Sequence, residues 1–371
     1  MRKVAGKLIW FINLLCAVIL LLSYASPFIH PGKILFPALL GLVYPYILLI
    51  NLAFVIYWLV LFKKELFLSL IVILLGWGHL MNLLPVNFSS AKKNTTEDTF
   101  SIMSYNVRTF DRFNWTKKKN SREEIFQLVR EKDPDILCMQ EFISLNKIGM
   151  REKDIVRQLV NYAQYSIYYI NRTTPETGFG CATFSKFPII KTSRIPFDST
   201  ANQAIYTDLL IYGDTIRLFN MHLQSVRLRQ ENMNFIDTLS LKYTNEQIKG
   251  VQEITGKLRN AYIQRAEQAT IIHNYILDSP YPVIVAGDFN DTPLSYSYHK
   301  IRKGLQDSFR ESGKGLGNTY AGDLPSLRID FILHSKDIKS TEFTRIKSKH
   351  SDHFPIMARL KKHTGEDKSE E

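Results

Sequence analysis

Three long stretches without a charged residue open the chain and constrain its fold more than any other feature. They are residues 8–24, 34–62 and 66–84. A helix needs about 20 apolar residues to cross the hydrocarbon core of a bilayer, and soluble domains seldom place three uncharged stretches in succession. The sequence therefore predicts a transmembrane region over residues 1–84, with one helix in each stretch.

The basic residues predict how these helices are oriented. Arg2, Lys3 and Lys7 precede the first stretch, and Lys63 and Lys64 lie between the second and the third. Short loops rich in Lys and Arg stay on the cytoplasmic side of a membrane. We therefore expect an integral membrane protein, in the inner membrane if the cell is Gram-negative, whose chain leaves the third helix on the periplasmic or extracellular side.

A cleavable signal peptide is an alternative interpretation of residues 8–24. Arg2 and Lys3, the apolar segment and the small pair Ala25-Ser26 fit that pattern as well. Either interpretation places the part of the chain that follows the third stretch outside the cytoplasm.

Composition changes sharply after the third stretch. Residues 85–98 are rich in Asn, Ser, Thr and Lys, which predicts a linker. Residues 99–360 are expected to form a catalytic domain, and residues 361–371 a disordered tail. The net charge is +12, and only six Lys or Arg precede residue 91. The basic excess therefore belongs mainly to the catalytic domain, where it suits anionic lipid headgroups and nucleic acid alike.

Short polar motifs follow or interrupt apolar, β-prone runs in the catalytic region. They are Ser104-Tyr105-Asn106-Val107-Arg108, Met139-Gln140-Glu141, Phe219-Asn220-Met221-His222-Leu223, Gly287-Asp288-Phe289-Asn290, Arg328-Ile329-Asp330-Phe331-Ile332 and Ser351-Asp352-His353. Each delivers a carboxylate, amide or imidazole at the edge of a strand, where functional residues gather. Singly, each motif also fits a capped turn, a polar loop or a buried histidine. Their joint occurrence favours a catalytic site.

The residue types suit a divalent cation and a phosphate ester. Mg²⁺ takes oxygen ligands, usually one or two carboxylates with waters and a substrate phosphate. Residues of the right type to bind it are Asn106, Glu141 and Asp352. Hydrolysis also needs a carboxylate that activates water and donors that stabilise charge on the phosphate. Candidates for these parts are His222, Asp288, Asn290 and His353.

In this order and at these separations, the motifs resemble the endonuclease/exonuclease/phosphatase superfamily, which includes deoxyribonuclease-like and sphingomyelinase-like enzymes. The resemblance covers about residues 99–360. It implies an α/β fold, a four-layer α/β sandwich of two packed mixed β-sheets flanked by helices, after the transmembrane region. It also implies an Mg²⁺ (or Mn²⁺) cofactor and hydrolysis of phosphoric ester bonds.

The resemblance further implies which residues hold the metal. Glu141 matches the family's metal-binding glutamate, with Asn106 and Asp352 as further members of the metal shell. Arg108 departs from the pattern, because some nucleases of the family carry an acidic residue at this position. An arginine there suits phosphate binding and weakens the match to abasic-site nucleases.

The same resemblance implies the catalytic roles. Asp288 matches the aspartate that orients or deprotonates the attacking water, and Asn290 matches the amide that holds the water and the phosphate. His353 matches the histidine that contacts the scissile phosphate, and Asp330 matches the carboxylate that orients this histidine. His222 matches a second histidine that donates to a phosphate oxygen or to the leaving group.

Two segments are left with several interpretations. Residues 225–260 form a charged, amphipathic insertion, which fits a solvated helical pair and also a lid or lipid-facing element. Residues 113–119 combine aromatic and basic side chains, which fit a solvated loop, a contact to a phosphate backbone or a contact to an anionic bilayer.

We interpret the sequence as that of a membrane-anchored, metal-dependent phosphoesterase acting on a phosphodiester of a lipid headgroup or lipid-linked substrate. Its expected partner is the lipid bilayer, and a lipid headgroup is favoured over nucleic acid because tethering raises the effective concentration of the domain toward lipid. The alternatives are an exported metal-dependent endo- or exonuclease and an inactive, membrane-tethered binding module.

Overall fold

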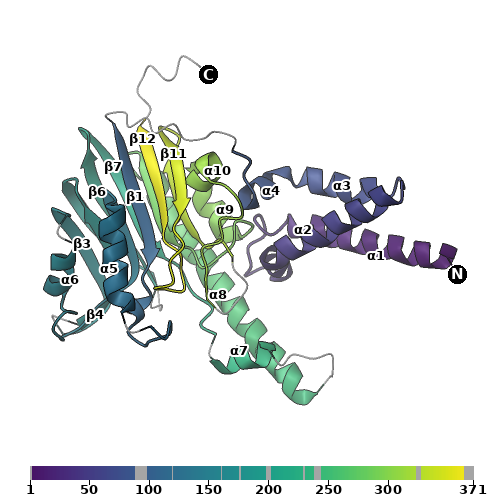
Figure 1. The fold of residues 1–371 in the computed structure, drawn as a ribbon, viewed down its shortest axis with the longest axis horizontal. Coiled ribbons are helices and arrows are strands. Elements are labelled where there is room, and N and C mark those ends of the chain that lie inside the picture. Colours follow the sequence, from purple (N-terminus) through teal and green to yellow (C-terminus); the bar gives the residue numbers. More distant parts are fainter. Residues whose placement is uncertain are drawn as a thin grey trace, which may run out of the picture. The chain divides into compact units, whose positions relative to one another are not determined.

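The computed structural model describes residues 2–87, 98–118, 120–159, 161–174, 177–197, 202–228, 230–237, 244–322 and 327–362 (Figure 1). The chain divides into two compact units. One unit comprises Met1–Leu80, Gln224–Thr270 and Leu294–Lys300. The other comprises Met81–Leu223, Ile271–Pro293 and Ile301–Glu371, and it contains both β-sheets.

Two six-stranded sheets form the second unit. The first has the order β11 (Ile338–Arg345), β12 (Ile356–Lys362), β1 (Thr99–Asn106), β2 (Ile136–Ser144), β4 (Thr177–Ser185) and β3 (Gln164–Thr174). The second has the order β5 (Ile189–Ile195), β6 (Gln203–Ile211), β7 (Asp214–His222), β8 (Val283–Asp288), β10 (Asp330–Ser335) and β9 (Leu305–Asp307). Both sheets are mixed, because β1 pairs with β2 and β7 with β8 in parallel while the other pairs are antiparallel.

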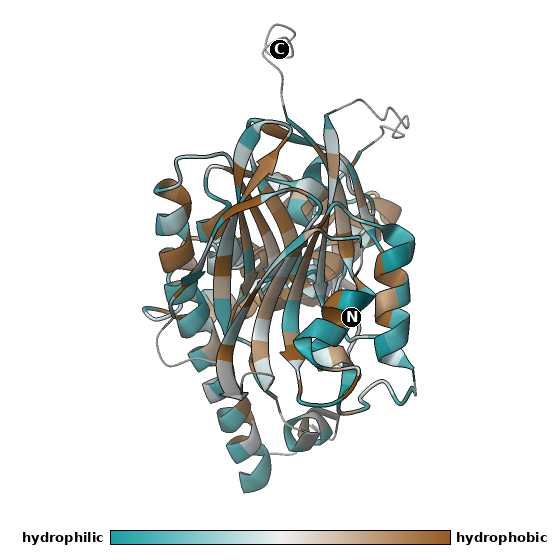
Figure 2. Cartoon of the chain, turned by 90° about the vertical axis from the view of Figure 1, so that its left-hand side faces the viewer, coloured by the Kyte–Doolittle hydropathy of each residue, from teal (hydrophilic) through white to brown (hydrophobic). Residues whose placement is uncertain are grey.

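The two sheets pack face to face over a core of aliphatic side chains. Ile102 of the first sheet belongs to the same fully buried cluster as Leu218, Ile284 and Ile332 of the second. These residues lie in runs of β-branched and aliphatic side chains, which favour strands with buried faces. Figure 2 shows hydrophobic residues concentrated along the strands. The predicted sandwich of two mixed sheets with flanking helices is confirmed.

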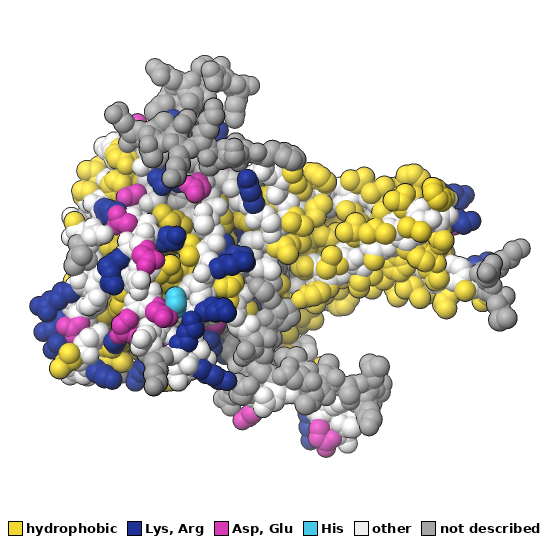
Figure 3. Space-filling view, in the orientation of Figure 1, with side chains coloured by type: hydrophobic (Ala, Val, Ile, Leu, Met, Phe, Trp, Pro, Cys, Tyr) yellow, Lys and Arg dark blue, Asp and Glu magenta, His cyan; other side chains and the backbone are white. Residues whose placement is uncertain are grey.

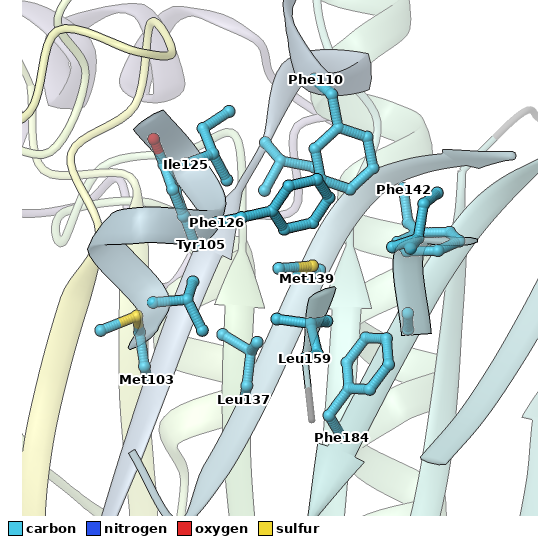
Figure 4. Close-up of a cluster of buried hydrophobic side chains, with 14 of the residues drawn as sticks. Met103, Tyr105, Phe110, Ile125, Phe126, Leu137, Met139, Phe142, Leu159 and Phe184 are labelled. Atoms are coloured by element: carbon cyan, nitrogen blue, oxygen red, sulfur yellow. The ribbon is translucent and has the colours of Figure 1, made fainter. Parts of the chain in front are cut away.

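Helices cover the outer faces. On the first sheet, α5 (Ser121–Lys132) and α6 (Glu152–Gln158) contribute Phe126 and Ile155 to a second buried cluster with Met139 and Phe184 (Figure 4). On the second sheet, Tyr275 of α8 (Asn245–Leu277) lies 6.4 Å, between ring centroids, from a tyrosine of β6. The remaining short helices are η1 (Arg108–Asp111), α7 (Gln230–Asp237), α9 (Tyr296–Arg302) and α10 (Ser308–Ser312).

The N-terminal stretches form helices with apolar surfaces (Figure 3). Two of them, α1 (Arg2–Ser23) and α2 (Phe36–Val60), are long and apolar enough to cross a membrane. The third stretch was expected to be one helix, but it breaks into α3 (Leu66–Leu75) and α4 (Trp77–Leu83), which are bent by 73°. Gly76 lies at the break, and a Cβ atom there would come within 2.2 Å of the Tyr24 ring. Among the described residues, two helices, or three if the bent pair is one span, therefore meet the requirements of length and composition for crossing a bilayer.

A buried polar triad joins α1, α2 and α3. Ser69 Oγ lies 2.6 Å from Asn13 Oδ1 and 2.9 Å from Asn51 Oδ1. Asn51 also donates through Nδ2 to the carbonyl oxygen of Cys16 at 3.1 Å. All three triad side chains are fully buried. Polar side chains that bond across helices hold apolar helices in one register.

Replacing Asn51 by Ala is expected to lower the free energy of unfolding of the helical region by about 0.5–1.7 kcal/mol, the range for interhelical hydrogen bonds in membranes. Unfolding of the detergent-solubilised chain in mixed micelles measures this loss. Leu49→Ala is the matched control, because Leu49 lies on the same helix with its side chain exposed. Equal losses in both variants would contradict a stabilising role for the triad.

The segments between the expected domains are only partly described. Asn87 Nδ2 donates to the carbonyl oxygens of Arg310 and Gly313 at 3.1 and 2.8 Å, so the start of the expected linker is bonded to the second unit. Residues 88–97 and 363–371 lie outside the described residues, and β12 continues through Lys362. In the 225–260 insertion, Asn232 of α7 bonds to Glu253 of α8, so this insertion contains a packed helical pair.

Candidate active site

The strand register brings three of the expected catalytic residues to one level of the second sheet. Asp288 is the last residue of β8, which lies between β7 and β10. It pairs with His222 at the end of β7 and with Asp330 at the start of β10. His222 Nε2 lies 3.7 Å from Asp288 Oδ2 and 3.8 Å from Glu141 Oε1. Three segments that are far apart in the sequence therefore meet at a single sheet edge.

Asp288 accepts hydrogen bonds at both of its carboxylate oxygens. Its Oδ2 atom accepts from Asn106 Nδ2 at 2.9 Å and from Asn290 Nδ2 at 3.2 Å, and its Oδ1 atom accepts from the Asn290 amide nitrogen at 2.8 Å. Asn290 also donates to the carbonyl oxygen of Leu223 at 2.9 Å. Burial raises the pKa of Asp288 to about 6, against the opposing effect of His353. A carboxylate with a pKa near neutrality is suited to accept a proton from water.

His353 is oriented by Asp330. Its Nδ1 atom lies 2.9 Å from Asp330 Oδ2, and its Nε2 atom lies 3.7 Å from Asp288 Oδ2. Burial opposes protonation of His353, but the charges of Asp330 and Asp288 outweigh it and raise its pKa well above the ordinary value. The imidazole is therefore held as a cation, which suits contact with a phosphate.

Glu141 faces the same region from the first sheet. The pairing of β2 with β4 shifts register between Met139 and Phe142, and Glu141 has a φ of +51°. Such a bulge re-aims a side chain at the edge of a sheet. Glu141 Oε1 accepts from Asn106 Nδ2 at 3.3 Å. Burial and the nearby charge of Asp352 raise the pKa of Glu141.

The Ser351-Asp352-His353 loop is fastened to the end of β1. Ser351 Oγ donates to the carbonyl oxygen of Asn106 at 2.8 Å. Asp352 Oδ2 lies 3.2 Å from Arg108 Nη1, in an ion pair. All eight residues expected at the site lie in the second unit: seven are at strand ends or in adjoining loops, and Glu141 is at the bulge inside β2.

The donor set fits a divalent cation. Glu141, Asp352 and Asn106 offer the carboxylate and amide oxygens that Mg²⁺ prefers, and the mutual repulsion of the two carboxylates would be relieved by a positive charge. A second candidate group consists of Asp288, Asp330 and His353, whose ligand atoms lie within 4.8 Å of one another. The sequence interpretation assigned these three residues to catalysis rather than to the metal.

A buried amide ladder behind the site had no role in the sequence interpretation. Gln140 Nε2 donates to Asn220 Oδ1 at 2.8 Å, which links β2 of one sheet to β7 of the other. Asn220 Nδ2 donates to the carbonyl oxygen of Ala182 at 2.9 Å. Gln140 precedes Glu141, and Asn220 stands two residues before His222. Their place inside the motifs was the only sequence signal for this link, which connects the two sheets beside the site.

Two family profiles match the chain. That of the Endonuclease/Exonuclease/phosphatase family matches residues 103–353, and a domain of unknown function, DUF8431, matches residues 6–83. No protein with a curated description matches.

Solved structures share the architecture of the second unit at low sequence identity. An endonuclease/exonuclease/phosphatase family protein from Bacteroides thetaiotaomicron superposes with a TM-score of 0.53 at 18% identity, over 72% of this chain and 98% of that one. The human Nocturnin catalytic domain, with bound sulfate, gives 0.52 at 18%, over 72% and 95%. Humanized D. rerio TDP2 gives 0.51 at 17%, over 71% and 99%. These similarities concern the fold alone.

Proposed function

The chain belongs to the endonuclease/exonuclease/phosphatase family, and from that premise we propose that it hydrolyses a phosphodiester of a lipid headgroup or lipid-linked molecule while anchored in a membrane. One observation carries the hydrolytic part of this proposal. Asp288, with its raised pKa, lies within 3.7 Å of both His222 Nε2 and His353 Nε2. A base next to two potential donors to a phosphate is the arrangement that hydrolysis requires.

In the proposed mechanism Asp288 takes a proton from the attacking water. Asn290 and Asn106 keep the carboxylate in place through their bonds to its oxygens. His353, held by Asp330 as a cation, donates to a non-bridging oxygen of the phosphate, and His222 donates to a phosphate or leaving-group oxygen. Buried donors in fixed positions stabilise developing charge without reorganising.

The proposed cofactor is Mg²⁺ or Mn²⁺, held by Glu141 with Asn106 and Asp352. A bound cation supplies Lewis-acid stabilisation of charge on the phosphate. Glu141 and Asp352 hold it by their carboxylates, and Asn106 aligns Glu141 with Asp288 because its Nδ2 atom contacts both. The group of Asp288, Asp330 and His353 is the alternative position.

The pH dependence of hydrolysis is expected to report on Asp288. Because a base must be unprotonated, and because burial raises the Asp288 pKa to about 6, activity should fall as the pH decreases through this value. A bound cation would lower the pKa of Asp288. The fall in activity would then occur at a lower pH, and not at a higher one. The measurement is kcat/KM from pH 4 to 8. A limb centred well above pH 7 would contradict the assignment.

We infer that the catalytic unit lies outside the cytoplasm. The helices α1 and α2 and the bent pair are the anchors, and Lys63 and Lys64 mark the cytoplasmic turn by the positive-inside rule. The triad of Asn13, Asn51 and Ser69 favours a retained first helix over a cleaved signal peptide, because cleavage would remove Asn13, one of the two partners of Ser69. A bilayer anchor favours a substrate within that bilayer.

Fusion reporters test this orientation. Alkaline phosphatase fused after Thr99 should be active, and a fusion after Lys64 should be inactive, because this enzyme folds only outside the cytoplasm. A green fluorescent protein should give the opposite pattern at the two sites. Fluorescence of the green fluorescent protein after Thr99, together with alkaline phosphatase activity after Lys64, would reverse the predicted topology.

Turnover assays on the solubilised full chain test the proposed substrate. With Mg²⁺, we expect release of phosphate-containing headgroups from liposomal phospholipid and hydrolysis of bis-p-nitrophenyl phosphate, both absent in EDTA. Cleavage of plasmid without turnover of liposomes would instead support the exported nuclease. If liposomal phospholipid, bis-p-nitrophenyl phosphate and plasmid are all left intact, and Mn²⁺ does not bind, the result would support the inactive binding module.

A further inference from the structure

The loop that follows β1 has an unusual backbone. Arg108, Thr109, Phe110 and Asp111 have φ values of +42°, +53°, +54° and +54° in succession. Left-handed backbone costs an L-residue roughly 1–2 kcal/mol, and residues held in this way gather at functional sites. The conformation of this loop, which begins two residues after Asn106, therefore lowers the stability of the fold.

Two anchors attach this loop to its surroundings. The Phe110 ring is buried in the cluster of Figure 4, at centroid distances of 5.3 Å from Phe126 and 5.6 Å from Phe142. The buried Asp111 carboxylate accepts from the Thr116 amide nitrogen at 3.1 Å and from the Thr116 hydroxyl. Residues 112–115 are thus held at both ends, by Phe110 and Asp111 on one side and by Thr116 on the other.

Arg108 connects the loop to the site. Its Nη1 atom lies 3.2 Å from Asp352 Oδ2, and its guanidinium carbon lies 4.3 Å from the centre of the Trp115 ring. Its side chain is 29% exposed, so a ligand can reach it. Stacking on an aromatic face pre-orients a guanidinium for bidentate contact with a phosphate.

Trp115 and Phe113 extend the stack away from the site. Their ring centroids lie 4.9 Å apart, and Trp115 and Phe113 are 42% and 60% exposed. Single exposed apolar residues are common, whereas adjoining ones on a fixed support indicate a binding surface. The pair lies next to positive charge. The guanidinium carbon of Arg112 lies 5.4 Å from the centre of the Phe113 ring, and Lys117 and Lys118 are exposed. Lys119 lies outside the described residues.

We propose that Arg108, Trp115 and Phe113 form a substrate subsite. Arg108 binds a non-bridging oxygen of the scissile phosphate, and the Trp115–Phe113 face holds a hydrocarbon group esterified to that phosphate. The subsite rests on the proposed phosphoesterase function and narrows its substrates to anionic amphiphiles. An apolar face with positive charges at its margin complements a molecule with a phosphate at one end of a hydrocarbon. A nucleoside ester, whose base would stack on the same face, is the competing substrate.

Three esters with one common leaving group test the subsite on the solubilised full chain. They are the methyl, the hexyl and the thymidine-5′ 4-nitrophenyl phosphates, all followed by 4-nitrophenolate release. We expect kcat/KM to be at least tenfold higher for the hexyl than for the methyl ester, since each buried methylene contributes about 0.8 kcal/mol. Trp115→Ala and Phe113→Ala should reduce this ratio toward one, whereas Trp115→Phe should preserve most of it.

Arg108→Ala should lower kcat/KM for all three esters by a similar factor of about 10 to 10², with partial recovery in Arg108→Lys. Tyr212→Ala is the matched control, because Tyr212 is an exposed aromatic residue in the β6–β7 turn, at the opposite end of β7 from His222. It should leave the hexyl-to-methyl ratio unchanged.

Two outcomes would overturn the subsite as proposed. If the hexyl and methyl esters are hydrolysed equally, or if Trp115→Ala leaves their ratio intact, the aromatic pair does not bind the hydrocarbon. If the thymidine ester is preferred and Trp115→Ala removes that preference, the face binds a nucleobase and the amphiphile assignment is wrong.

A binding measurement separates this subsite from the proposed function. If the unsubstituted chain hydrolyses none of the esters, the phosphoesterase proposal fails, and binding to Trp115 can still be followed. Trp115 is the single tryptophan outside the apolar N-terminal stretches, so replacing Trp10, Trp58 and Trp77 by Phe isolates its fluorescence. A spectral change with hexyl phosphate and none with methyl phosphate would support the subsite; no change with either would overturn it.

Discussion

Replacing Asp288 by Asn is expected to lower kcat by about 10²–10⁴, the usual contribution of a general base. The substitution keeps the shape of the side chain and one acceptor oxygen, but it removes the negative charge and the proton acceptor. The change is read from 4-nitrophenolate release with bis-p-nitrophenyl phosphate at saturating Mg²⁺. Circular dichroism should show the same folded state, because the side chain volume is preserved.

Asp291→Asn is the matched control for this variant. Asp291 stands three residues after Asp288, is also buried, and accepts from the Thr292 amide nitrogen at 3.0 Å. An Asn side chain can still accept that bond, so activity should stay within about threefold of the unsubstituted chain. If Asp288→Asn retained near-full activity, the base would have to be sought elsewhere.

Removal of the cation is expected to abolish hydrolysis, and the loss should be reversed by Mg²⁺ or Mn²⁺. Glu141→Gln should weaken Mn²⁺ binding by about 10- to 100-fold, because a carboxylate in a strand bulge is replaced by a neutral amide. Binding of Mn²⁺, followed by electron paramagnetic resonance, measures the affinity independently of turnover.

The matched control is Glu131→Gln, an identical change on the exposed surface of α5. Full activity in EDTA would rule out the metal mechanism. Unchanged Mn²⁺ affinity in Glu141→Gln, together with a loss in Asp330→Asn, would move the cation to the group of Asp288, Asp330 and His353.

Most of the site residues could be predicted from the sequence, because they are polar residues at the ends of predicted strands. Asn106, Asp288 and His222 each end an apolar run, and such runs predict strands without knowledge of their partners. Glu141 was identified through its motif, although its orientation depends on a bulge in β2 that no local pattern announces. The family resemblance supplied the sandwich, because pairing between distant strands is not encoded in local periodicity.

Contacts between distant segments account for most of what the sequence interpretation missed. At the break, Gly76 leaves room for the ring of Tyr24, which is far away along the chain. The link from Gln140 to Asn220 depends on two sheets facing each other. The Arg108–Trp115 stack is a local contact, and it was missed because it accompanies four left-handed residues for which no glycine gave a signal.

The sequence by itself determined the apolar helices, the strand runs and the chemical types at their ends, since these follow from local composition and spacing. Only the tertiary structure decided that His222, Asp288 and Asp330 share one level of a sheet, because register is set by pairing between strands. It alone also decided the pKa of Asp288, because burial and neighbouring charges depend on what surrounds the carboxylate in space.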